Sequence, residues 1–105
     1  MPQLLSDSEI KVRLKTASGW RLVGGRTRRI QKRYMLSDFV KAIRFVNRIG
    51  RISEEVAHHP DIDIRYDRVT LALSTHSVGG ISDLDFEVAD RFDAAVPTTL
   101  PRRRV

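Results

Sequence analysis

Apolar side chains recur every three or four residues in three stretches of this 105-residue chain, which is the spacing that gathers side chains on one face of a helix. The pattern predicts three amphipathic helices, over residues 6–16, 37–57 and 82–96. Each starts at a serine, a favoured N-cap residue: Ser6, Ser37 and Ser82. The expected apolar stripe of the middle helix is Phe39, Ala42, Ile43, Val46, Ile49 and Val56. The expected stripe of the last helix is Leu84, Val88, Phe92 and Ala95, and Pro97 stops it.

Four shorter stretches between these helices predict β-strands, over residues 20–23, 27–35, 61–65 and 69–75. The first pair turns at Gly24-Gly25, and the second pair turns around Tyr66-Asp67-Arg68. In the last strand Val69, Leu71 and Leu73 alternate with polar or small residues, so they share one face.

The element order α-β-β-α-β-β-α predicts an α+β fold, with a single four-stranded antiparallel sheet and three helices packed on one face. We expect one domain over residues 1–97, followed by a basic tail over residues 98–105.

Composition narrows the class of protein. The chain is 41% hydrophobic and 30% charged, as is usual for a globular domain, and it has no cysteine. It therefore has no disulfide, no thiol nucleophile and no zinc–thiolate site. No apolar run reaches the roughly 18 residues of a membrane span, and the start does not resemble a signal peptide. We expect a cytoplasmic protein that does not enter membranes.

Charge is distributed unevenly along the chain. Residues 1–51 carry 13 Lys/Arg and 3 Asp/Glu, a net charge of +10, whereas residues 52–105 carry 6 and 10, a net charge of −4. Clustered basic residues attract phosphate, so a nucleic-acid partner is one interpretation. The basic half shows no nucleic-acid motif and no interleaved aromatic residues. We therefore interpret it as solvated faces and expect no nucleic-acid partner.

All three histidines lie between Glu54 and Asp85, and two of them are adjacent in His58-His59-Pro60. Histidine titrates near neutrality, so such a cluster indicates proton transfer or metal binding. Three histidines and an aspartate are a reasonable zinc set, although adjacent histidines usually point apart. Pro60 disfavours helical geometry at the residue before it, so the middle helix should end beside the histidine pair.

The spacing of these residues resembles that of the pterin-4a-carbinolamine dehydratase family. The matching positions are Glu54-x-x-x-His58-His59-Pro60, Tyr66, Thr75-His76 and Asp85, with Gly19-Trp20 before the first strand and Phe39 opening the second helix. The resemblance covers most of the chain and thins at its termini. Ile62 departs from the pattern, because many relatives carry an aromatic residue there.

The resemblance implies an enzyme that dehydrates 4a-hydroxytetrahydropterin to quinonoid dihydropterin, with no metal and no redox cofactor. It implies that His58, His59 and His76 are the active-site histidines. We expect His58 and His76 to form the acid–base pair and His59 to hold the substrate. It also implies a homodimer or homotetramer that recycles a pterin cofactor for an aromatic amino-acid hydroxylase.

Other residues have a functional and a structural interpretation. Asp85 matches the family's aspartate and could orient His76, but it is also placed to cap the last helix. Glu54 matches an acidic position, and Pro60 is expected to shape the turn. Trp20 could stack on a pterin ring or belong to the core. The alternative function is a non-catalytic assembly or dimerisation partner on the same fold.

Overall fold

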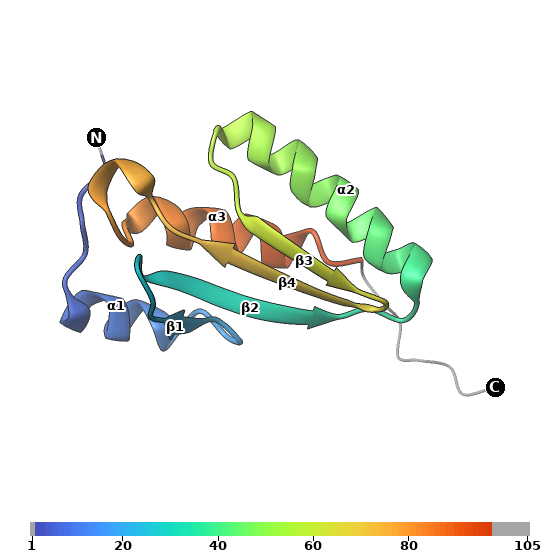
Figure 1. Ribbon diagram of the computed structural model, residues 1–105, viewed down its shortest axis with the longest axis horizontal. Coiled ribbons are helices and arrows are strands. Elements are labelled where there is room, and N and C mark those ends of the chain that lie inside the picture. Colours follow the sequence, from blue (N-terminus) through green and yellow to red (C-terminus); the bar gives the residue numbers. More distant parts are fainter. Residues whose placement is uncertain (1, 98–105) are drawn as a thin grey trace.

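The computed structural model describes residues 2–97, so the predicted basic tail over residues 98–105 lies outside the described residues. The elements follow the predicted order, as Figure 1 shows. They are α1 (Asp7–Leu14), β1 (Arg21–Val23), β2 (Arg29–Met35), α2 (Phe39–Val56), β3 (Asp61–Arg65), β4 (Arg68–Leu73), the short 3-10 helix η1 (His76–Val78) and α3 (Asp83–Ala94). No helix in this part of the chain is long and apolar enough to cross a membrane.

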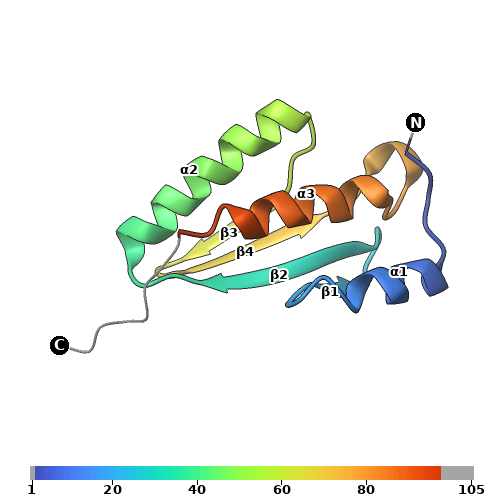
Figure 2. The same ribbon diagram turned by 180° about the vertical axis from the view of Figure 1, so that it is seen from behind.

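The four strands form one antiparallel sheet in the order β1-β2-β4-β3, which confirms the predicted α+β class. Figure 2 views the sheet from the side on which the helices lie. Alternate residues of β4 point to that side, and Val69, Leu71 and Leu73 are fully buried there, as the alternation predicted. Within residues 2–97, the opposite face of the sheet carries no helix.

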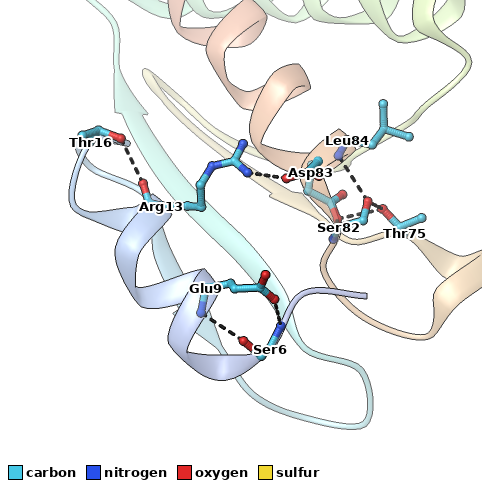
Figure 3. A network of polar contacts seen from close by, with 9 residues as sticks. Ser6, Glu9, Arg13, Thr16, Thr75, Ser82, Asp83 and Leu84 are labelled. Carbon is cyan, nitrogen blue, oxygen red and sulfur yellow. Dashed lines mark hydrogen bonds and ion pairs between the residues drawn. The ribbon is translucent and has the colours of Figure 1, made fainter. Parts of the chain in front are cut away.

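Each of the three α-helices begins after a residue whose side chain accepts a hydrogen bond from the first turn. Ser6 and Glu9 form the predicted capping box at α1, and Ser82 and Asp85 form a second one at α3. Figure 3 shows both starts, together with Arg13 of α1 reaching Asp83 of α3. The prediction for α2 was wrong by one residue: its N-cap is Asp38, not Ser37. The carboxylate of Asp38 accepts a 2.8 Å bond from the backbone N–H of Lys41.

The predicted apolar stripe of α2 was partly wrong. Ala42 and Ile49 are buried as expected, but Phe39 is 49% exposed at the first turn of the helix. Phe45 takes the core position instead, where its ring lies 4.8 Å from that of Tyr34 in β2. The stripe therefore runs through Ala42, Phe45 and Ile49, which share one helical face at spacings of three and four residues.

A cluster around Asp93 ties β2 to the far end of α3. The carboxylate of Asp93 accepts a 2.6 Å bond from the hydroxyl of Tyr34 and a 2.9 Å bond from the ammonium of Lys32. The indole N–H of Trp20 lies 3.3 Å from both carboxylate oxygens. Burial, and then the hydrogen bond and charge of Asp93, raise the pKa of Tyr34 far above its ordinary value, so the phenol stays protonated and donates.

Helix α2 ends in a left-handed residue that is not glycine. Ala57 has φ = 53° and ψ = 42°, and its N–H bonds to the carbonyl of Ser53. A left-handed conformation costs a residue with a Cβ about 1–2 kcal/mol, whereas glycine adopts it freely.

We therefore expect Ala57→Gly to raise the free energy of unfolding by about 0.5–1 kcal/mol, after the extra chain entropy of glycine is subtracted. Urea unfolding followed by circular dichroism measures the change. Ala94→Gly is the matched control, because Ala94 is exposed in α3 with helical geometry and should lose up to about 1 kcal/mol. Destabilisation by both substitutions would contradict the account of Ala57.

Candidate active site

The backbone of the histidine pair follows the end of α2 and is held by the helix cap. After the left-handed residue Ala57, the backbone N–H of His58 bonds to the carbonyl of Ser53 at 3.1 Å. Pro60 then directs the chain into β3. The sequence prediction that the helix ends beside this pair is confirmed, and the two side chains are presented where α2, β3 and the end of β4 meet.

A surface cavity of about 480 Å³ lies at this junction. All three histidines of the protein line it, although His76 is 17 residues further along the chain, in η1. The other lining residues are Pro2, Ala57, Pro60, Asp61, Ser74, Thr75, Ser77 and Leu84. Cavities of this size typically hold a small molecule, and this one combines ring nitrogens, hydroxyls and apolar walls.

His58 is the least exposed of the three histidines. Its side chain is 10% exposed, and Nε2 lies 2.7 Å from Oδ1 of Asp85, a residue with no exposed surface. The other carboxylate oxygen accepts from the hydroxyl of Thr75 at 2.8 Å and from the backbone N–H of Ser82 at 2.9 Å. Thr75 and Ser82 thus donate to one oxygen of Asp85, while the other oxygen faces Nε2 of His58.

The directions of these hydrogen bonds follow from counting hydrogens. The hydroxyl of Thr75 has one hydrogen and gives it to Asp85, so in the 2.8 Å contact between Thr75 and Ser82 the serine donates. Figure 3 shows this contact and the bond from the N–H of Leu84 to Ser82. When Nε2 of His58 carries a hydrogen, the carboxylate accepts from it, and Nδ1 is the nitrogen of that tautomer with a free lone pair.

His59 and His76 are in more open surroundings. Nε2 of His59 lies 2.6 Å from Oε2 of Glu54, one turn back in α2, and the two side chains are 59% and 79% exposed. A separate cleft of about 770 Å³ between α2 and β3 lies beyond them, and it shares only His59 and Pro60 with the histidine cavity. His76 is exposed, and its ring makes no hydrogen bond within residues 2–97.

The other predicted site residues do not all lie at the histidine cavity. Pro60 lines the cavity, and Glu54 reaches it only through His59. Trp20 does not line it: the indole is 5% exposed and packs edge-to-face on Tyr34, with its N–H used by Asp93. The expectation that Trp20 stacks on a ligand is thus not supported by its position, and the core interpretation holds. Tyr66 is 69% exposed at the hairpin turn and lines neither space.

Asp85 also differs from expectation in its partner. Sequence spacing paired it with His76, but the structure pairs it with His58, because the fold brings the side chain of Asp85, in the first turn of α3, to the residue that follows the C-cap of α2. Thr75 and Ser82 were not predicted to support a histidine. Two features of the sequence could have indicated this role. The Ser82-x-x-Asp85 capping box fixes the position of the carboxylate, and Thr75 lies just beyond the end of β4.

The metal interpretation needs several ligands directed at one point. Among residues 2–97, no group of three or more His, Cys, Asp or Glu side chains is arranged to hold a metal ion. Nε2 of His58 and Nε2 of His59 face different carboxylates, those of Asp85 and Glu54.

Fold and cavity together define a small α+β protein with a histidine-lined site suited to acid–base chemistry on a small molecule. The model of the family described as pterin 4 alpha carbinolamine dehydratase matches residues 3–95. The chain belongs to this family.

Relatives and solved structures agree with this family assignment. A protein of Herpetosiphon aurantiacus, provisionally named a pterin-4-alpha-carbinolamine dehydratase, is 49% identical over 86% of this chain and 91% of its own. One of Roseiflexus castenholzii with the same provisional name is 43% identical over 91% of this chain and all of its own. The crystal structure of a Brucella melitensis transcriptional coactivator/pterin dehydratase superposes with a TM-score of 0.82 at 33% identity, over 88% of this chain and 97% of that one.

A further solved structure shares the fold alone. It is a pterin dehydratase-like protein identified as a RuBisCO assembly factor in the alpha-carboxysome, with a TM-score of 0.64 and 23% identity over 77% of this chain and 93% of that one.

The geometry predicts that Asp85 supports the fold as well as the site. We expect Asp85→Asn to lower the free energy of unfolding by roughly 2–4 kcal/mol, because an amide cannot accept from all three buried donors. Asp90→Asn is the matched control, since Asp90 is an exposed residue of α3 and its loss should change stability by less than about 0.5 kcal/mol. Equal effects of the two substitutions in urea unfolding would contradict this role of Asp85.

Proposed function

We propose that this protein dehydrates 4a-hydroxytetrahydropterin to quinonoid dihydropterin and water by histidine acid–base catalysis. The observation that carries the proposal is that all three histidines of a chain from this family line one cavity. The reaction needs proton transfers at two atoms, and imidazole is the side chain with a pKa near neutrality.

The reaction is balanced without a metal or a redox cofactor. A general acid protonates the hydroxyl oxygen on C4a, and the C4a–O bond breaks as water leaves with the bonding electrons. A base removes the proton from N5, and the electrons of that N–H bond form the C4a=N5 double bond. One proton is given, one is taken, and nothing is oxidised.

The surroundings of the histidines support a division of roles. With Nε2 of His58 donating to Asp85, Nδ1 is left as a base in a mostly enclosed position, and the imidazolium that forms is stabilised by the carboxylate. His76 is exposed, so it can exchange protons with solvent and serve as the acid. His59 is held by Glu54 at the rim and is assigned to substrate binding. In this assignment Asp85 positions His58 and does not touch substrate.

Turnover of single variants tests the assignment. The purified, chelator-treated protein should convert freshly generated 4a-hydroxytetrahydropterin, monitored by the absorbance of quinonoid dihydropterin. His58→Ala and His76→Ala should each lower kcat/KM by about 10²–10⁴-fold, whereas His59→Ala should act mainly on KM. Glu87→Ala, at an exposed position of α3, is the control. If His59→Ala alone abolished turnover, the division of roles would be wrong.

A partner role without catalysis is the second candidate, and it is favoured by the shared fold of the protein identified as a RuBisCO assembly factor. The two candidates separate in the same assay. A wild type that is folded by circular dichroism but has no turnover would remove the enzyme proposal and favour the partner role.

We also propose that residues 1–97 act as one domain and that the protein is a homodimer or homotetramer. The edge of β3 is unpaired in the described chain, and Ile62 and Ile64 on its helix side are each 40% exposed. Phe39 and Val40 at the start of α2 are 49% and 56% exposed. An unpaired edge beside apolar side chains favours association with a second copy. The expected place of action is the cytoplasm, in recycling pterin for an aromatic amino-acid hydroxylase.

Light scattering during size-exclusion chromatography tests the association. The wild type should elute with two or four times the 12.0 kDa mass of the chain, and the double substitution Ile62→Lys/Ile64→Lys should lower that mass. Val12→Lys is the control, because Val12 is 61% exposed on α1, away from β3. A wild type that is monomeric at 100 µM, roughly the top of the concentration range for specific association, would refute the proposal.

A further inference from the structure

The helix-free face of the sheet carries an ordered set of arginines. The strand register defines four successive rows of side chains on this face, and every row contains an arginine. Arg29 lies in the first row, Arg21 in the second beside Gln31, Arg33 in the third opposite Thr70, and Arg68 in the fourth opposite Met35. We call Arg21, Arg29, Arg33 and Arg68 the arginine ladder.

The ladder is available to a partner. Arg21, Arg33 and Arg68 are exposed, and Arg29 is half-buried. Within residues 2–97, Arg21 and Arg33 make no side-chain hydrogen bond or ion pair, while Arg29 bonds only to backbone carbonyls of the turn before β2. Arg68 approaches Asp67 no closer than 4.0 Å. These charges are therefore not neutralised within the described fold.

Two acidic residues share this face, and both lie on its outer strand. Asp61 and Asp63 are in β3, opposite Ala72 and Thr70 of β4. The carboxylate of Asp63 forms an ion pair with the guanidinium of Arg65 at 3.1 Å, so its negative charge is balanced within β3. The positive band therefore runs over β1, β2 and the start of β4, with the negative groups confined to the other edge.

The surface between these rows is hollowed. A depression of about 590 Å³ is lined by three members of the ladder, Arg29, Arg33 and Arg68, together with Gln31, Thr70 and Ala72 and, on the side of β3, Asp61, Ile62, Asp63 and Arg65. Successive rows on one face of a strand are roughly 7 Å apart, since a strand rises about 3.4 Å per residue. Three of the four rows thus place a guanidinium in the depression, and Arg21, in the second row, lies on the same face but does not line it.

We propose that this face binds the phosphate backbone of single-stranded nucleic acid. An extended polyanion matches one guanidinium per row, and the guanidinium fork suits phosphate geometry better than an ammonium does. The depression also contains the polar and small side chains of Gln31, Thr70 and Ala72, and its two carboxylates, Asp61 and Asp63, are confined to β3. The proposal reverses the expectation from sequence, because a charge count does not show which arginines share a face.

The same face is poorly suited to an acidic protein. Protein interfaces need a desolvated, largely apolar centre, whereas the apolar residues of this face, Val23, Met35 and Ala72, lie in three different rows. Binding here must come from charge, and charge-dominated binding to a polyanion is the mode of sequence-independent nucleic-acid recognition.

Fluorescence anisotropy of a labelled 20-nucleotide oligothymidine, titrated with full-length protein, tests the proposal. Binding should be micromolar at 50 mM salt and weaken with a slope of about −3 in log K against log salt, as four neutralised phosphates predict. The triple substitution Arg21→Gln/Arg33→Gln/Arg68→Gln should weaken binding by on the order of tenfold or more and reduce the slope by about 2. Arg29 is left in place because it holds the turn before β2.

The matched control is Lys41→Gln/Arg44→Gln/Arg51→Gln on α2, which removes the same net charge from another surface and leaves the C-terminal arginines unchanged. It should retain wild-type affinity within about threefold. Equal loss in both triple variants, or no binding at 50 mM salt, would overturn the proposal. Equal competition by a polyglutamate peptide of the same charge would overturn it in favour of an acidic protein. Dehydratase turnover of the ladder variant should be unchanged, so this test is independent of the proposed enzyme activity.

Discussion

The buried carboxylate of Asp85 is the interaction on which the rest of the structure depends. It has no exposed surface, and it joins three elements: it caps α3 through the N–H of Ser82, holds the end of β4 through Thr75, and fixes the exit of α2 through His58. A buried charge is tolerated only when its acceptor sites are filled, so the three elements must meet at this point. The site is therefore a consequence of how the fold satisfies one acidic group.

This constraint explains why the three histidines differ in their surroundings. His58 is enclosed and has one nitrogen committed to Asp85, whereas His59 pairs with an exposed glutamate and His76 is exposed on η1. Identical side chains thus have different hydrogen-bond partners and different access to solvent. The proposed dehydration gives one proton and takes one within a single cavity. Histidines in two different surroundings can divide these two tasks.

The sequence predicted the fold well because periodicity reports burial directly. It predicted the three α-helices and the four strands, two of the three caps and the end of α2, but not the short 3-10 helix η1. It failed where two residues of α2 or its start were similarly suited: the cap is Asp38 instead of the adjacent Ser37, and the core phenylalanine is Phe45 instead of Phe39, six residues earlier. The partner of Asp85 could not be predicted, because it depends on which elements meet in space. The same is true of the arginine ladder, which only the strand register reveals.

The central claim is that the cavity lined by His58, His59 and His76 is the pterin site. The most direct test is a crystal structure with a bound 7,8-dihydropterin, a stable analogue that lacks the C4a hydroxyl. We expect the pterin ring in this cavity, with N5 within hydrogen-bond reach of His58 and with His76 facing C4a, where the hydroxyl of the substrate would be. A ring bound instead in the cleft between α2 and β3, or no density at saturating ligand, would contradict it.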